Sequence, residues 1–246
     1  PEDVEAAMNM ELIRNWMDLD LAVSGRYSAP AAALLTRLGA MPKLEPGDAE
    51  TLKSGLATMV SFSSYTSVTV KKGAAASFAD PTGMKYGFNL PGIFEIVKNP
   101  KLGTSGFDWE VDPAGTRLIL EDVAQRTELP LFIIERGLGL KETPDTRGEI
   151  RDVRRIAYLR KQIEQARLAL AHGVPLIGYC TWSAFDLAST QNGYQKRYGL
   201  IYVDREDDDP KDCRRIPKLS YTWFQKVIAS NGQDLALTEE LNGKSE

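Results

Sequence analysis

The sequence predicts a parallel α/β fold, and two patterns along the chain carry this prediction. Short apolar or β-branched runs without alternation are typical of buried parallel strands, and three of them occur, at residues 58–63, 131–134 and 176–181. Helical patterns alternate with these runs, as in a sheet built from strand–helix units. The length of 246 residues is close to the roughly 250 of one (β/α)8 TIM barrel.

The first half of the chain contains several expected helices. Acidic side chains follow Pro1, and apolar residues then recur at helical spacing as far as Trp16. A second helix is expected over residues 31–38 and a short one from Asp48. Residues 64–112 are rich in Gly, Ala, Pro and Lys, and we interpret them as a long excursion that contains a hairpin.

The second half contains the clearest helices. Asp112 and Pro113 suit the start of a helix over 113–126. The longest helix is expected over 150–172, with its apolar face formed by residues spaced three and four apart: Ile156, Leu159, Ile163, Ala166 and Leu170. A last helix is expected over 219–229. No linker divides the chain, so we predict a single domain over residues 1–246.

Composition excludes several classes of protein. The 30 Lys and Arg against 34 Asp and Glu give a net charge of −4, which argues against nucleic acid or an anionic membrane as partner. No apolar run reaches the ~18 residues of a membrane span. The two cysteines, Cys180 and Cys213, exclude a disulfide scaffold and favour a cytoplasmic setting; Cys180 is expected to pack inside the barrel. With one histidine, His172, and no metal or nucleotide motif, we expect no cofactor.

Glu135 is the first candidate for chemistry. It ends an apolar strand in LPLFIIERGLG, and Gly137 and Gly139 leave space beside it. A carboxylate at a strand mouth can act as a nucleophile or a base. The pattern alone leaves open that Glu135 only forms an ion pair with a nearby arginine.

The chain resembles family 1 glycoside hydrolases along most of its length. The segments that carry the resemblance occur in the family's order: PEDVEAA, SGRYS, EPGD, SFSSYTS, DPAGTRLIL, LPLFIIERGLG, RIAYLRKQIEQ, GYCTWSAFD, KRYGLIYVD and WFQKVIASNGQDL. Within the family it is most similar to the 6-phospho-β-glycosidases. The resemblance implies the C-terminal part of a TIM barrel, in which parallel strands alternate with helices and the N-terminal strands are missing.

The resemblance also implies roles for individual residues. Glu135 becomes the nucleophile that forms a glycosyl-enzyme, and Tyr65 its hydrogen-bond donor. Trp182 becomes a platform for the sugar ring. A retaining enzyme needs a second carboxyl group about 5 Å away as acid/base, but the family's Asn-Glu-Pro setting for it does not occur in this sequence. Without the resemblance, Tyr65 and Trp182 are interpreted as ordinary packing residues.

The stretch STQNGYQKRYG implies a phosphate site. Ser189, Lys196 and Tyr198 match the phosphate-binding triad of the 6-phospho enzymes, with Lys196 supplying charge and the hydroxyl groups neutral donors. Ordinary β-glucosidases have a glutamate where this chain has Ser189, and that charge would repel a phosphate by about 4 kcal/mol at ~4 Å. The alternative is a surface loop with an incidental lysine. Thr190 favours glucosides over galactosides.

Two positions depart from the family pattern. Ser64 stands where a second aromatic residue is often found, and Arg136 replaces the Asn of Glu-Asn-Gly. Since neighbours on a strand point to opposite sides, Arg136 is expected to avoid Glu135. We hypothesise that this substitution lowers activity below the family norm or abolishes it.

The function that these residues favour is hydrolysis of phosphorylated β-glucosides with retention of configuration. The chain is then a cytoplasmic 6-phospho-β-glucosidase-like enzyme that acts on a phosphorylated disaccharide or aryl β-glucoside. Two alternatives stay open: a catalytically inactive partial barrel that binds phospho-sugars or assembles with a partner, and a β-glucosidase without phosphate preference. A partial barrel exposes sheet edges, so we expect a missing N-terminal half or a second copy as partner.

Overall fold

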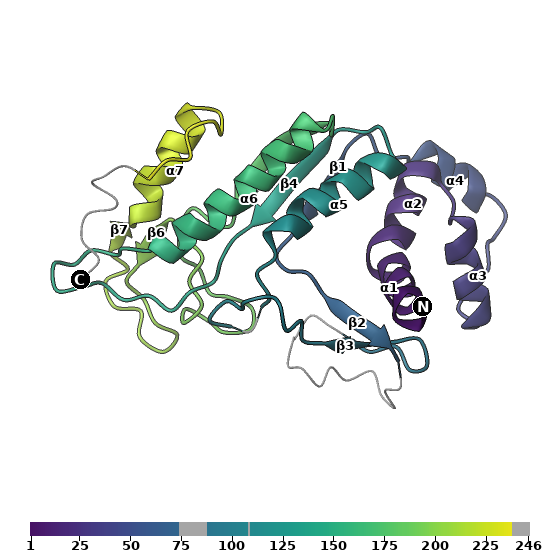
Figure 1. The fold of residues 1–246 in the computed structure, drawn as a ribbon, viewed down its shortest axis with the longest axis horizontal. Coiled ribbons are helices and arrows are strands. Elements are labelled where there is room, and N and C mark those ends of the chain that lie inside the picture. Colours follow the sequence, from purple (N-terminus) through teal and green to yellow (C-terminus); the bar gives the residue numbers. More distant parts are fainter. Residues whose placement is uncertain (74–87, 108, 238–246) are drawn as a thin grey trace. The chain divides into compact units, whose positions relative to one another are not determined.

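A computed structural model describes residues 1–73, 88–107 and 109–237 of the chain (Figure 1). The chain divides into two compact units. The first contains residues 1–60, 67–102 and 122–130, and the second contains residues 61–66, 103–121 and 131–246. Each unit is assembled from several stretches of chain, so the single domain over 1–246 stays a prediction.

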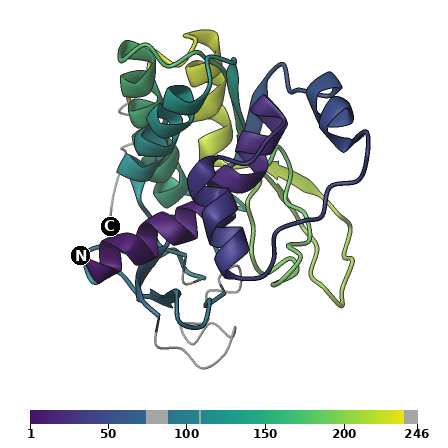
Figure 2. The same ribbon diagram turned by 90° about the vertical axis from the view of Figure 1, so that its right-hand side faces the viewer.

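The first unit begins with helices (Figure 2). They are α1 (Glu2–Glu11), the π-helical turn η1 (Leu12–Trp16), α2 (Met17–Ser24), α3 (Ala29–Arg37) and α4 (Asp48–Ser54). The expected N-terminal helix is therefore continued through a π-turn, which adds one residue to the helical ring and changes the phase of the apolar positions. Gly25 ends α2 with φ of 72°, a conformation that glycine adopts without strain.

A β-hairpin completes the first unit and confirms the hairpin expected in the long excursion. Strands β2 (Thr69–Lys72) and β3 (Phe94–Val97) are antiparallel, with Thr69 opposite Val97. Phe94 is fully buried and packs in one cluster with Ala6 and Met10 of α1. This burial explains why a short hairpin is stable, since two strands alone are marginal in water.

The second unit contains the sheet that the sequence predicts. Strand β4 (Leu131–Arg136) lies between β1 (Val60–Ser63) and β5 (Leu176–Thr181), and β4 and β5 are parallel. Phe132 of β4 stands opposite Gly178 of β5, and a Cβ atom at Gly178 would lie 1.9 Å from the Phe132 ring. Alternating strands and helices along the chain confirm the parallel α/β class.

Three helices accompany this sheet: α5 (Pro113–Arg126), α6 (Val153–Ala171) and α7 (Leu219–Ala229). The ends of α5 and α7 are as predicted, and the Asp112 carboxylate accepts a hydrogen bond from the Gly115 N–H at 3.2 Å, as an N-cap does. A short antiparallel pair, β6 (Ile201–Val203) and β7 (Arg215–Pro217), precedes α7.

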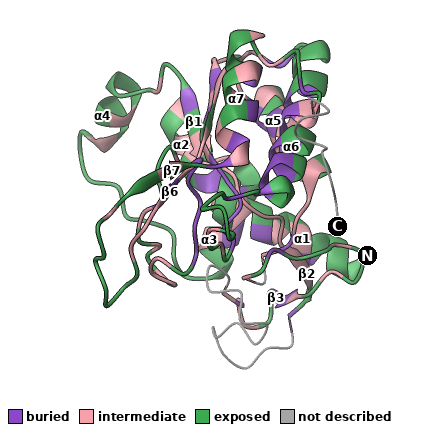
Figure 3. Ribbon diagram, turned by 90° about the vertical axis from the view of Figure 1, so that its left-hand side faces the viewer, coloured by how far each residue is buried: buried purple, intermediate pink, exposed green. Residues whose placement is uncertain are grey.

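Helix α6 carries the main core of the second unit. Its buried residues lie along one side (Figure 3) and include Ile156, Leu159, Ile163 and Ala166, as predicted. The buried face of α6 differs from the predicted one at two residues. Leu170 is 48% exposed, whereas the polar Gln162 is buried because its carbonyl accepts a hydrogen bond from the Thr116 hydroxyl at 2.5 Å.

Several side chains of β4 and β5 are open to solvent. Ile134 is 41% and Ile177 62% exposed, and Cys180 is exposed as well. The expectation that Cys180 packs inside a barrel is therefore wrong for this chain, because β5 is the last strand of the described sheet and has no further neighbour to cover it. Among the described helices, none is long and apolar enough to cross a membrane.

Candidate active site

The ends of the three parallel strands are level with one another. The Ser64 N–H, just after β1, donates to the Glu135 carbonyl at 3.0 Å, and the Trp182 N–H, just after β5, donates to the Arg136 carbonyl at 2.9 Å. Chemistry in parallel α/β folds gathers at the carboxyl ends of strands. Glu135, Tyr65 and Trp182 thus come from one edge of the sheet.

Tyr65 and Glu135 form a direct contact. The Tyr65 hydroxyl donates to Glu135 Oε2 at 2.9 Å, which is the bond that the resemblance implies. Burial, and then this bond to a carboxylate, raise the pKa of Tyr65 well above its usual range. The phenol is therefore a proton donor to the carboxylate over the whole physiological pH range. The Tyr65 ring also meets the rings of Trp109 and Tyr198 edge to face, with centroids 5.4 and 6.2 Å apart.

The segment after β4 brings the predicted phosphate residues to this edge. Leu140 and Arg197 exchange two backbone hydrogen bonds of 2.9 Å, so the Lys196–Tyr198 stretch runs beside residues 137–140. A Cβ atom at Gly139 would lie 2.6 Å from Cε of Lys196, and one at Gly137 would lie 2.2 Å from the Trp182 carbonyl oxygen. The two glycines noted in the sequence allow this close approach.

Lys196 is a buried cation among aromatic rings. Its side chain is almost fully buried, and its ammonium nitrogen lies 3.6 Å from the centroid of the Trp109 ring. The Phe107 and Tyr198 rings lie 5.1 and 5.5 Å from the same nitrogen. Aromatic faces attract a desolvated ammonium. They hold the charge of Lys196 at the edge of the sheet that carries Glu135.

Ser189 is placed by its backbone. It exchanges two hydrogen bonds with Gly193, of 3.0 and 2.9 Å, and Gly193 has φ of 54° with the Asp207 carboxylate against it. In the described part of the chain the Ser189 hydroxyl forms no hydrogen bond with Lys196 or Tyr198. The structure therefore brings Glu135, Tyr65, Lys196 and Tyr198 together and places Ser189 on the adjoining loop.

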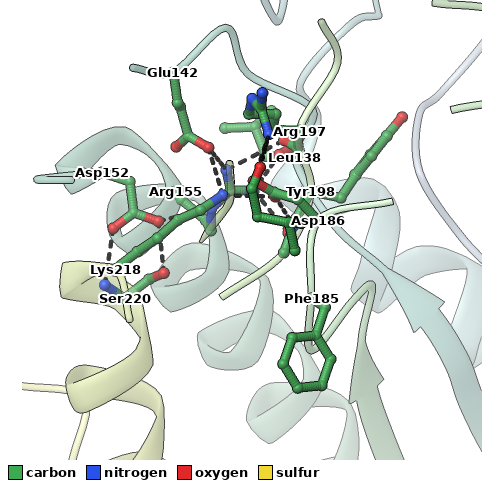
Figure 4. A network of polar contacts seen from close by, with 12 residues as sticks. Leu138, Glu142, Asp152, Arg155, Phe185, Asp186, Arg197, Tyr198, Lys218 and Ser220 are labelled. Carbon is green, nitrogen blue, oxygen red and sulfur yellow. Dashed lines mark hydrogen bonds and ion pairs between the residues drawn. The ribbon is translucent and has the colours of Figure 1, made fainter. Parts of the chain in front are cut away.

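A buried network of charges, which sequence reasoning missed, supports the segment that carries Lys196 and Tyr198 (Figure 4). Three cations and three carboxylates form it: Arg155, Arg197, Lys218, Glu142, Asp152 and Asp186. All but Glu142 are at most 5% exposed, and Glu142 is 7% exposed at its side chain. Equal numbers of opposite charges let these groups be buried together.

The network holds backbone groups on both sides of the site. The Arg155 guanidinium donates to the carbonyls of Leu138, Tyr198 (3.0 Å) and Arg197 (3.2 Å). Arg155 thus joins the segment after Glu135 to the segment that carries Lys196. The sequence held only a weak signal of this network, namely an aspartate, Asp152, three residues before Arg155. In the structure Asp152 Oδ2 lies 2.8 Å from Arg155 Nε.

Known proteins with the same pattern identify the family. Residues 1–233 match the model of glycosyl hydrolase family 1. The chain belongs to this family. Among solved structures, a family 1 β-glucosidase from Thermotoga maritima superposes with a TM-score of 0.78 at 27% identity, over 95% of this chain and 48% of the other. The sheet and helices of the second unit therefore form part of a TIM barrel.

Curated relatives come from the phosphate-using branch that the sequence suggested. The chain is 40% identical over 243 residues to the aryl-phospho-β-D-glucosidase BglC of Bacillus subtilis, and 37% identical over 236 residues to the 6-phospho-β-glucosidase AscB of Escherichia coli. Both alignments cover 96% of this chain but only 50% and 48% of the relatives. The chain thus spans about half the length of the curated relatives it matches.

Proposed function

We propose that this chain supplies the nucleophile and the phosphate site of a retaining 6-phospho-β-glucosidase. One observation carries the proposal: the buried aliphatic chain of Lys196 packs against Gly139, four residues beyond Glu135, and its ammonium lies over the Trp109 ring. A cation held beside the segment that follows a strand-end carboxylate suits a glycoside that carries a phosphate group. The names of the relatives BglC and AscB support phosphorylated β-glucosides as substrates.

The proposed reaction follows from the Tyr65–Glu135 pair. Glu135 attacks the anomeric carbon, the bond to the aglycone oxygen breaks, and that oxygen leaves with the electron pair. Water then attacks the same carbon and releases Glu135, so two inversions give retention. Tyr65, which donates to Oε2, holds the carboxylate in position. Lys196, Ser189 and Tyr198 bind the phosphate, and Trp182 packs on the sugar ring.

The acid/base carboxylate is proposed to come from outside this sequence, because no Asn-Glu-Pro motif occurs in it. The exposed Ile134 and Ile177 side chains are apolar surface of the sheet that a further barrel segment or a second copy can cover. We propose a cytoplasmic location, since phosphorylated glucosides usually arise during sugar uptake into the cell. Thr190 supports a preference for glucosides over galactosides.

A mechanism-based label tests the nucleophile in a way that does not need the acid/base carboxylate. The probe is 2,4-dinitrophenyl 2-deoxy-2-fluoro-β-glucoside 6-phosphate, whose leaving group needs no protonation and whose fluorine slows release of the sugar. The expected result is one sugar adduct by intact mass spectrometry, mapped to the peptide that contains Glu135. The E135Q variant should stay unlabelled, and the analogue without phosphate should label far more slowly.

Other outcomes separate the alternatives. Equal labelling by both analogues would support a β-glucosidase without phosphate preference. Binding of glucose 6-phosphate with no adduct would support an inactive phospho-sugar-binding module. Labelling at another carboxylate would overturn the assignment of Glu135.

A further inference from the structure

Arg136 carries a buried charge with an unusual set of partners. Its side chain is 2% exposed, and among the described residues no carboxylate lies within ion-pair distance of it. Its Nη1 donates instead to two oxygens of one residue, the Ser64 carbonyl at 2.7 Å and the Ser64 hydroxyl at 2.5 Å. A buried guanidinium is costly unless its N–H groups are satisfied. Ser64 satisfies Nη1, the Tyr158 ring lies 6.0 Å from the guanidinium carbon, and Nε has no hydrogen-bond partner in the residues that the structure describes.

Ser64 in turn is held from both sides. Its N–H donates to the Glu135 carbonyl at 3.0 Å, while Arg136 binds its carbonyl. The Ser64 carbonyl and the Tyr65 nitrogen belong to one rigid peptide plane. Fixing that carbonyl therefore fixes the positions of the Tyr65 nitrogen and Cα, from which the side chain reaches Glu135 Oε2 at 2.9 Å.

The two contacting residues also depend on each other in size. With Ser64 Oγ only 2.5 Å from the guanidinium, a larger side chain at 64 would meet Arg136. A shorter side chain at 136 would leave the Ser64 carbonyl without its cationic donor. Position 64 and position 136 are the two departures from the family pattern noted in the sequence, and here they are in contact.

We propose that Arg136 and Ser64 act as one coupled unit that positions the Tyr65 hydroxyl on Glu135. Arg136 is then a positioning residue and does not face the sugar, and its replacement of asparagine is matched by the small residue at 64. The role of this positioning in catalysis rests on the proposed function. The contact between Arg136 and Ser64 can be tested without substrate.

The test measures the Tyr65 phenol by NMR. Protein labelled with 13C at the tyrosine ζ carbon has nine tyrosine signals, and Y65F assigns one of them. In R136M, the Tyr65 signal should move towards those of exposed tyrosines, because its bond to the carboxylate is loosened. S64A should move it in the same direction by less, and R136K should restore part of the shift.

Coupling is tested by combining the two changes. If the residues act as one unit, S64A adds no further shift in the R136M background. The matched control is T116V, which removes a different buried hydroxyl bond and should leave the Tyr65 signal in place. If R136M does not fold, S64A alone still tests the proposal.

Two results would overturn the coupled unit: a Tyr65 signal that neither S64A nor R136M moves, or shifts that simply add. Neither result depends on the labelling of Glu135, so failure here is distinguishable from failure of the proposed function.

Discussion

Replacing Lys218 by methionine should be among the most damaging single changes outside the site itself. The Lys218 ammonium lies 2.6 Å from Glu142 Oε2 and 2.8 Å from Asp186 Oδ1, with no side-chain exposure. At an effective dielectric near 20, each attraction is worth about 6 kcal/mol. Burial and the nearby Arg155 oppose it and lower the pKa of Lys218.

The net cost follows from what the substitution leaves behind. Glu142 keeps Arg155 at 2.7 Å and Asp186 keeps Arg197 at 3.2 Å, but two cations then face three carboxylates. Removing one partner from a buried ion pair usually costs about 3–5 kcal/mol. We expect K218M to lower the free energy of unfolding by about this amount in urea denaturation followed by tryptophan fluorescence.

The control is a pair of the same kind on the surface. Arg160 and Glu164 lie 2.9 Å apart with side chains 47% and 41% exposed, so R160M should cost about 0.5 kcal/mol or less. The double variant K218M/E142Q should recover part of the lost stability, because it removes the excess carboxylate and leaves two cations facing two carboxylates. If K218M lowers the free energy of unfolding no more than R160M does, the buried network does not stabilise the fold.

Three further predictions concern the site directly. Because Tyr65 keeps its proton above pH 10 in the folded protein while the unfolded chain loses it, unfolding free energy should fall as pH rises there; Y65F should make that slope shallower in denaturation series. G139A should cost about 1–3 kcal/mol by overpacking and weaken glucose 6-phosphate binding in calorimetry, because the new Cβ displaces Lys196; G106A, with open space around it, should do neither. K196M should weaken glucose 6-phosphate binding by about 100- to 1,000-fold while leaving affinity for glucose unchanged; an equal loss for both ligands would contradict the phosphate assignment.

Much of the fold could be predicted from local chemistry. The 113–126 helix was located by an N-cap and a first-turn proline and matches α5, and the helix expected over 219–229 matches α7. The π-turn at Leu12–Trp16 was missed because one extra residue in a helical ring leaves no mark in composition. Cys180 was misplaced because its exposure depends on whether another strand lies beside β5, which no local pattern reports.

The site was predictable in a different way. Glu135 stood out by its position, but Tyr65 and Lys196 depended on the resemblance to a family. The contact of Tyr65 with Glu135 spans 70 residues and that of Gly139 with Lys196 spans 57, and contacts so distant in the chain have no local signature. The charged network was missed for a physical reason. By their hydropathy, Asp186 and Lys218 are expected on the surface, because hydropathy counts each residue without its partner. The fold brings opposite charges beside them, and these offset the cost of burying each charge.

The packing of Phe132 on Gly178 has a consequence for the accuracy of the site. Sliding β5 along β4 by one residue would present Ile177 or Tyr179 to the Phe132 ring, where even a single methyl group has no room. Such a slip would also turn every side chain of β5 to the opposite face. Gly178 therefore fixes which residue of β5 stands opposite Phe132. Beyond this pair the register shifts once more, so that Arg136 stands opposite Thr181 and the Trp182 N–H reaches the Arg136 carbonyl. A residue without a side chain thus anchors the middle of the strand that ends at this tryptophan.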